Sequence, residues 1–377
     1  MTKQLSRVTL KNMNIFSCLP LLFFLLSPVS AQSPKAPSRS QTEWDRVVKA
    51  ARSEGKVVIA GPSGLQWRNA TMMFESDYPG VGVEFMGGLG RDHVTRLLAE
   101  RRGGQFQWDV LIVGAATGVS LKPESVLDPL TGALVLPDVL NDRAWLGGFA
   151  DGWMDREQRL VYCFMAEAPP EVYVNRDFVT ERELSRVEDL VDPKWRGKIS
   201  WNEPRSPGGG SLQAANLLYL LGEDFLRRLL RQDIAPAEDL RQQTDWIVRG
   251  KFPIAMSLDY RFLAEFQKNG VGLNVVPLAP DSPAGGALRL SPGSGCIMLI
   301  NRAPHPNAAR VFINWLLSRK GQNDYVKETM VSSRRLDVIH GREIARPKPG
   351  GKYYSLSKEG MLQYNDRAIA IAREILK

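Results

Sequence analysis

Residues 189–221 read DLVDPKWRGKISWNEPRSPGGGSLQAANLLYLL and combine three local patterns. Lys198–Trp201 alternates polar and apolar residues, which predicts a short strand. Asn202–Gly210 contains two prolines and three consecutive glycines, a composition typical of a turn. From Leu212 onward, apolar residues recur at helical spacing. Strand, glycine-rich loop and helix start follow one another here, and this order indicates an α/β fold.

The glycine-rich loop is a candidate ligand-binding element. Free backbone N–H groups at a helix start, together with the helix dipole, attract anions. We expect Ser206 and Gly209 to contact a ligand there, and Arg205 to add a fixed positive charge. The alternative is an ordinary connection between a strand and a helix, because a glycine run alone is weak evidence for a ligand.

The same order of elements repeats nearer the N-terminus. Strands are predicted at Lys56–Ala60, Val81–Met86 and Asp109–Val113, with helical patterns between them, and each strand ends in a loop of small residues. This rhythm implies right-handed crossovers and a parallel sheet. In open α/β sheets, ligands lie outside the carboxyl ends of the strands. The ligand contacts predicted at these ends are Ser63, Arg91 and Thr117.

After Lys198 the rhythm restarts, which indicates a second α/β unit. A strand predicted at Phe252–Ser257 leads into a helix predicted at Tyr260–Lys268, so Tyr260 and Arg261 are further candidate ligand contacts. The segment Asp281–Gly295 is rich in Pro, Gly and Ser, and it predicts a connection that returns the chain to the first unit.

The first 31 residues have the features of a secretory signal peptide. Lys3, Arg7 and Lys11 precede a short apolar core, and Val29-Ser30-Ala31 forms a small-residue cleavage site. The mature chain is therefore expected to be exported. Removal of this segment lowers the formal net charge from +8 to +5, and the remaining charges are scattered. We therefore predict no nucleic-acid partner.

Two cysteines, Cys163 and Cys296, remain in the mature chain. Export permits a disulfide between them, but the sequence does not set their distance, and we favour two buried free thiols over a bridge. With three histidines in the chain and no Gly-x-Ser-x-Gly turn before a helix, there is little basis for a catalytic triad or a zinc site. We predict no enzymatic activity, no catalytic residues, no metal site and no cofactor.

Five segments, at residues 189–199, 248–251, 303–309, 317–322 and 332–337, carry a family resemblance. Through these segments, the chain resembles the bacterial periplasmic solute-binding proteins of ABC importers, in the branch that includes the ferric-ion-binding proteins. The resemblance covers nearly all of the mature chain. The resemblance implies the type II periplasmic binding fold, in which two α/β lobes, each a mostly parallel sheet flanked by helices, clamp a ligand between them. It also implies a monomer in the periplasm that delivers a small solute to a membrane ABC permease.

On this basis we divide the chain into a signal peptide at 1–31, a discontinuous first lobe at 32–168 and 286–377, and a second lobe at 169–285. Family members that bind ferric ion use two adjacent tyrosines after a second-lobe strand, with a His and an acid from the first lobe. Only Tyr260 matches here, because Arg261 stands where the second tyrosine would be and the loop Gly61–Gln66 offers no His.

We therefore predict a small anionic ligand, carrying carboxylate or phosphate, as the solute. Arg205 and Arg261 are expected to hold the anion from the second lobe, and loss of either would weaken the affinity roughly 10- to 150-fold. Ser63, Arg91 and Thr117 are expected to close over it from the first lobe. The alternatives are ferric iron bound through Tyr260 with an external anion, and a ligand-sensing subunit for a signalling receptor.

Overall fold

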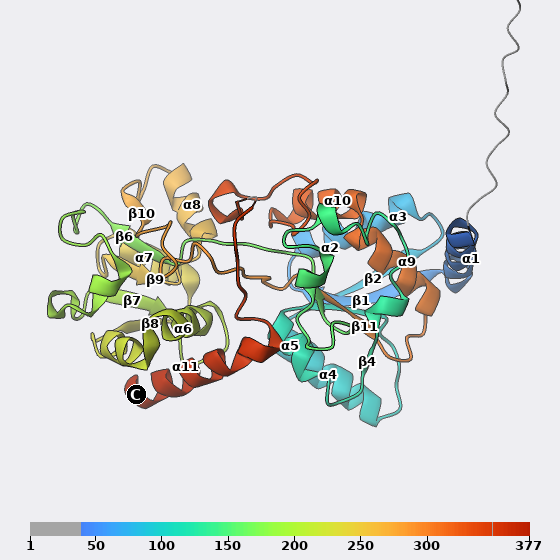
Figure 1. Cartoon of the computed structure of the whole chain (residues 1–377), viewed down its shortest axis with the longest axis horizontal. Coiled ribbons are helices and arrows are strands. Elements are labelled where there is room, and N and C mark those ends of the chain that lie inside the picture. The colour runs from blue at the N-terminus through green and yellow to red at the C-terminus, as the bar shows by residue number, and fades with distance from the viewer. Residues whose placement is uncertain (1–38, 349) are drawn as a thin grey trace, which may run out of the picture.

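The computed structural model describes residues 39–348 and 350–377, and the expected signal peptide lies outside them. In this part of the chain the elements form two lobes that lie side by side (Figure 1). The first-lobe strands are β1 (Lys56–Pro62), β2 (Gly82–Gly88), β3 (Val110–Val113), β4 (Leu127–Asp128), β5 (Tyr162–Cys163) and β11 (Cys296–Ile300). Its helices are α1 (Arg39–Glu54), α2 (Leu65–Met72), α3 (Phe74–Asp77), α4 (Gly90–Arg102), α5 (Ala115–Ser120), α9 (Pro306–Leu317) and α10 (Arg319–Thr329).

The second lobe contains the elements between the two connecting segments and the last helix of the chain. Its strands are β6 (Val172–Asn175), β7 (Ile199–Asn202), β8 (Ala235–Ala237), β9 (Ile254–Met256) and β10 (Val275–Pro277). Its helices are α6 (Gly209–Leu230), α7 (Leu240–Val248), α8 (Tyr260–Lys268) and α11 (Leu362–Ile375).

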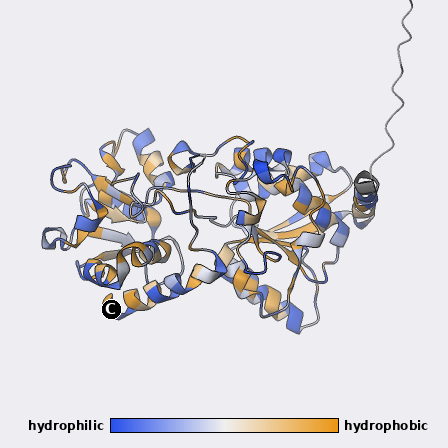
Figure 2. Ribbon diagram, in the orientation of Figure 1, coloured by the Kyte–Doolittle hydropathy of each residue, from blue (hydrophilic) through white to orange (hydrophobic). Residues whose placement is uncertain are grey.

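The first-lobe sheet is covered on both faces. All four residues of β3 are buried, because successive side chains of a strand point to opposite faces. Val110 and Ile112 pack into the core that includes residues of α1 and α9. Leu111 and Val113 pack on the other side, in the core that includes Leu97 of α4. Figure 2 shows the hydrophobic strands in the interior of this lobe.

The second lobe repeats this arrangement around its own sheet. In β6, Val172 and Val174 face the core that α6 and α11 cover. Tyr173, between them, faces the core that contains Ile247 of α7 and Leu263 of α8. A sandwich of helices on both faces of each sheet confirms the α/β prediction.

Both sheets are mixed rather than mostly parallel. The first has the order β2-β1-β3-β11-β4, with β5 paired to β11, and the second has the order β10-β6-β9-β7-β8. The βαβ strands pair in parallel, as β1 does with β2 and β3, and as β7 does with β8 and β9. β6 and β11 each enter their lobe from the other lobe, and both pair antiparallel with their neighbours.

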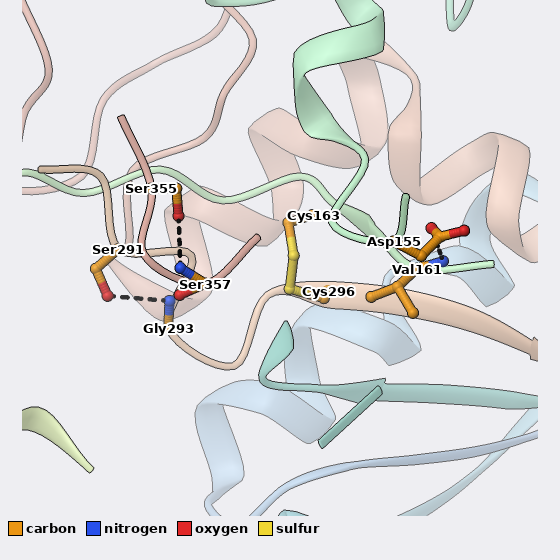
Figure 3. Close-up of a disulfide and its surroundings, with 8 residues drawn as sticks. All are labelled: Asp155, Val161, Cys163, Ser291, Gly293, Cys296, Ser355 and Ser357. Carbon is orange, nitrogen blue, oxygen red and sulfur yellow. Dashed lines mark hydrogen bonds between the residues drawn. A yellow bond between two sulfur atoms is a disulfide. The ribbon is translucent and has the colours of Figure 1, made fainter. Parts of the chain in front are cut away.

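Two segments that cross between the lobes lie against each other. The outgoing segment follows β5 and leads to β6, and the returning segment precedes β11; Glu167 and Ser291 form an antiparallel bridge between them. A disulfide joins Cys163 to Cys296, which lie directly opposite in the β5–β11 ladder (Figure 3). The prediction of two free thiols was wrong, because strand pairing brings together residues that are 133 positions apart.

The C-terminal part of the chain contacts both lobes. Glu359 forms an ion pair with Lys122 of the first lobe at 2.6 Å. The helix α11 then runs along α6, where Ala368 and Ile371 join the second-lobe core (Figure 1). The sequence-based division placed residues 286–377 in the first lobe, whereas α11 packs on the second. The apolar stripe of this segment predicted a helix. It did not show which lobe the stripe would pack against.

Candidate functional site

A cavity of about 300 Å³ lies where the crossing segments meet the second-lobe helix starts. The first lobe contributes Trp67 of α2 and Val331, which follows α10. The second lobe contributes the start of α6 at Gly209 and the β9–α8 turn. The crossing segments, the end of β7 at Asn202 and the start of α7 at Leu240 supply the remaining wall, so lining residues come from both lobes.

The crossing segments present alternate residues to the cavity. Glu167 and Glu171 line it from the outgoing segment, while Arg289 and Ser291 line it from the returning segment. Residues two apart in an extended chain point to the same side, which places these charged side chains on one surface. Opposite strand directions then set Glu167 beside Ser291.

The central polar contact of the cavity joins Tyr260 to Glu167. Tyr260 is the first residue of α8, and its hydroxyl donates a hydrogen bond to Glu167 Oε1 at 3.2 Å. The backbone N–H of Ser332 donates to the same carboxylate oxygen. A phenol of the second lobe and a carboxylate of the outgoing crossing segment therefore lie in direct contact.

Burial changes the acidity of both groups. Desolvation raises the pKa of the Glu167 carboxyl, against the opposing effects of Arg261 and of the two hydrogen bonds. Desolvation also raises the pKa of Tyr260, and the neighbouring Glu167 charge adds to this shift. Each group favours its protonated form more strongly than it would in water.

Three carboxylates and two guanidinium groups line the cavity. Asp259 pairs with Arg261 at 2.7 Å, and Glu171 forms a buried ion pair with Arg289. Within the described part of the chain, Glu167 has no such cationic partner at ion-pair distance. Among the charged groups that line the cavity, the Glu167 carboxylate is therefore the one without a described ion-pair partner, and it lies next to the Tyr260 hydroxyl.

The residues predicted from sequence divide into two groups. Those that line the cavity are Gly209, Tyr260 and Arg261. Those that do not are Ser63, Arg91, Thr117, Arg205 and Ser206. Ser63 and Ser206 are exposed in their loops, Arg91 is exposed beside Asp92, and Thr117 lies in α5 close to Gly90.

Arg205 has partners within the second lobe. Its Nε and Nη2 donate to Glu203 at 2.8 and 2.7 Å, and its Nη1 donates to the Leu376 carbonyl at 3.3 Å. Arg373 donates in turn to the Arg205 carbonyl. These contacts anchor the C-terminal helix, and the side chain is directed to that helix rather than to the cavity lining.

Sequence reasoning missed Glu167, Glu171 and Arg289. Arg289 lies within Asp281–Gly295, which was interpreted as a connection, and Glu167 and Glu171 flank the proline-containing stretch Ala168-Pro169-Pro170, where Glu171–Asn175 was interpreted as a strand. The sequence carried no local signal for these residues, because charged side chains are ordinary in solvated connections and the two crossing segments meet only in the fold.

The described residues contain no cluster of three or more His, Cys, Asp or Glu that could hold a metal ion. Among residues 39–348 and 350–377, none of the helices combines the length and apolar character that a membrane crossing requires.

Solved structures with the same architecture include proteins that bind iron. Iron-bound HitA from Pseudomonas aeruginosa has a TM-score of 0.62 and 16% identity, over 85% of this chain and 99% of its own. The Trichodesmium protein IdiA (FutA), in complex with iron and citrate, has a TM-score of 0.65 and 19% identity, over 85% and 99%. Apo ferric ion-binding protein A from Pasteurella haemolytica has a TM-score of 0.66 and 14% identity, over 85% and 98%.

At these identities the similarity establishes the fold, which is the type II periplasmic binding fold. Comparison with curated protein sequences yields no match. The sequence profile of the bacterial extracellular solute-binding proteins matches residues 59–323, which include most of both lobes and both crossing segments. This protein therefore belongs to the bacterial extracellular solute-binding protein family.

Proposed function

We propose that this protein captures ferric iron between its lobes in the periplasm and delivers it to the membrane permease of an ABC importer. The family supports the general role of a solute-binding component. The choice of iron rests on one observation, the contact between the Tyr260 hydroxyl and the unpaired Glu167 carboxylate. It agrees with the iron bound in two solved structures of the same fold, those of HitA and IdiA (FutA).

The two groups suit a hard cation. Carboxylate oxygens are preferred by hard metal ions, and a phenolate is an anionic oxygen of the same kind. Ferric ion would replace the phenolic proton of Tyr260. Its positive charge would also balance the Glu167 carboxylate, which has no cationic partner at ion-pair distance among the described residues.

Tyr260 and Glu167 supply two oxygen ligands, and a trivalent ion requires several. Arg261 occupies the position of a second tyrosine, and it pairs with Asp259. An anion carried with the iron would complete the coordination in this proposal. We therefore replace the bare anion expected from sequence with iron accompanied by an anion.

A small anion without iron is the second candidate, because Arg261 and Arg289 both line the cavity. Both guanidinium groups already face carboxylates, which reduces their attraction for a free anion. The three carboxylates against two guanidinium groups also disfavour an uncompensated negative ligand. The charges that line the cavity therefore favour a ligand that contains ferric iron over a small anion alone.

Titration of the purified protein with ferric citrate, and with citrate alone, tests the proposal. Ferric citrate should produce a visible tyrosinate-to-iron charge-transfer band and raise the melting temperature. Tyr260→Phe should abolish the band, whereas the control Tyr353→Phe, whose hydroxyl contacts Lys348 outside the cavity, should retain it. An equal thermal shift with citrate alone, and no band with ferric citrate, would favour the anion.

A further inference from the structure

We propose that a second cavity, separate from the candidate site, binds a small organic carboxylate. This second cavity has a volume of about 180 Å³ and lies beside the segment that follows α10. None of its lining residues also lines the cavity between the lobes. The proposal therefore goes beyond the capture of iron and does not depend on it.

Backbone hydrogen bonds fix two stretches of this segment around the second cavity. In the first stretch, the Arg334 carbonyl accepts a hydrogen bond from the N–H of Leu146 at 2.8 Å. The chain then turns back, and the carbonyl of the buried Ala345 accepts from the N–H of Ala168 at 2.8 Å. Residues 346 and 347, which follow directly, line the cavity together with Leu146. The walls are therefore held by the fold.

The outgoing crossing segment separates this cavity from the candidate site. Leu146 packs in an apolar cluster with Ala166, whereas Met165 and Glu167 line the cavity between the lobes. Successive residues of an extended chain point to opposite sides. Leu146 thus lies on the face of the outgoing segment that is turned away from Tyr260 and Glu167.

The ionisable side chains that line the second cavity are Arg335, His340 and Arg346, and none of the described residues in its lining is acidic. Arg335 is fully buried and pairs with Asp138 and Asp337 at 2.9 Å each. Its charge is therefore compensated from outside the lining, and its role is to form a fixed part of the wall. The donors that remain for a ligand belong to the other two residues.

Arg346 and His340 have hydrogen-bond donors without acceptors. Arg346 donates through Nη1 to Glu343, whose side chain is 76% exposed, and its Nε and Nη2 have no hydrogen-bond partner among the described residues. The His340 ring likewise has none there. Burial and the nearby Arg346 charge lower the pKa of His340, so the neutral ring offers one N–H donor at neutral pH. An ionised carboxylate matches this pair of donors, because it accepts two charge-assisted hydrogen bonds from an arginine.

The rest of the lining selects a ligand with an apolar body. Leu146, Leu336 and Pro347 supply apolar walls. The volume of about 180 Å³ exceeds the roughly 150 Å³ of an engineered cavity that holds benzene. A carboxylate with a body about the size of one ring would remove these walls from water, which an inorganic anion would not do. The lining therefore favours an organic carboxylate over phosphate.

His340 allows the test to be read at the cavity itself. Benzoate would be titrated into the protein while the side-chain NMR signals of its three histidines are followed, and His340→Gln would identify the His340 signal by its loss. Benzoate should shift this signal until the site is saturated. The signals of His93 and His305 should stay in place, because these rings contact the Gly61 carbonyl and Asp109 instead.

Two further probes separate charge from shape. Benzamide has the size of benzoate without its charge, and inorganic phosphate has charge without an apolar body. Each should bind at least about tenfold more weakly than benzoate, since each loses either the charge-assisted hydrogen bonds or the apolar contact.

A pair of neighbouring substitutions tests the role of Arg346. Arg346→Gln should weaken benzoate binding by about tenfold or more. The matched control Lys348→Gln removes the same charge two positions along the chain. Lys348 is exposed, pairs with Asp281 and lies outside the lining of the second cavity, so the control should stay within about twofold of wild type. Tyr260→Phe should bind benzoate at this cavity as wild type does.

The absence of a saturable shift of the His340 signal, up to the solubility limit of benzoate, would overturn the proposal. Equal affinities for benzoate and benzamide would refute an anion site, and equal affinities for benzoate and phosphate would refute an organic ligand. Equal losses in Arg346→Gln and Lys348→Gln would indicate a general effect of charge and reject the contact with Arg346. All of these outcomes leave the iron proposal to its own test, the charge-transfer band.

Discussion

The acidity of Tyr260 makes iron binding a proton-releasing reaction. Burial raises the pKa of this phenol above its ordinary value of 10.0, so it holds its proton at neutral pH and must lose it to coordinate a cation. The affinity should therefore rise with pH, by about tenfold per pH unit for each proton released. Calorimetry in two buffers of different ionisation enthalpy would count these protons. Tyr260→Phe should release about one proton fewer, and an unchanged count would exclude the tyrosine as a ligand.

Arg205 illustrates how a side chain predicted to bind ligand can serve the fold instead. Its guanidinium joins Glu203 to the end of the C-terminal helix. We expect Arg205→Ala to change ligand affinity by less than about threefold and to lower the stability by about 1 kcal/mol. Chemical denaturation alongside a ligand titration would separate the two effects. A tenfold loss of affinity with unchanged stability would restore the sequence-based assignment.

The sequence predicted those site residues that follow from a local rule. Gly209, Tyr260 and Arg261 lie at helix starts after strands, and the strand-end rule for open α/β sheets identified them. Glu167 and Arg289 become neighbours of the site only because two segments far apart in the chain run against each other. No local pattern encodes that pairing, so these residues could be found only in three dimensions.

At the scale of elements, the disulfide joins the crossing segments at the point where both leave the first lobe. It closes a loop that spans 133 positions and contains the whole β6–β10 sheet. In the chain-entropy description, closure of so long a loop destabilises the unfolded state by up to about 5 kcal/mol. The double variant Cys163→Ser/Cys296→Ser should unfold at clearly lower denaturant concentration than wild type. A reductant should produce the same shift in wild type and none in the variant.

Most elements could be predicted from hydrophobic periodicity, and the differences have local causes. The helix α8 matches its predicted range, Tyr260–Lys268. The apolar spacing over Ala237–Arg249 predicts a helix, but Ala235–Ala237 forms β8 on the edge of the sheet, beside β7, and the helix starts at Leu240. The α6 helix extends to Leu230 through a break at Gly222, whose φ of 83° favours glycine. The direction in which β6 and β11 pair with their neighbours could not be predicted in this way. It depends on the route by which the chain crosses between the lobes.

At the scale of the whole molecule, ligand binding should draw the two lobes together. The cavity takes its lining from both lobes, so a ligand that contacts both walls stabilises the closed arrangement by its differential affinity. Small-angle scattering should show a smaller radius of gyration with ferric citrate than without it. Tyr260→Phe should show no change at the same concentration, and a wild-type profile that stays constant at saturation would exclude closure.

The position of α11 determines when the protein can finish folding during synthesis. This helix covers α6, and Ala368, Ile371 and Ala372 complete a core most of whose other members, from Val172 to Met256, were synthesised more than a hundred residues earlier. The second lobe must therefore remain partly uncovered while the rest of the chain emerges, even though its sheet is complete at β10. We expect a chain ended at Gly360 to expose that core and to bind hydrophobic dyes. For a chain exported through the predicted signal peptide, this delay means that the second lobe reaches its protected state only after α11 has followed it across the membrane.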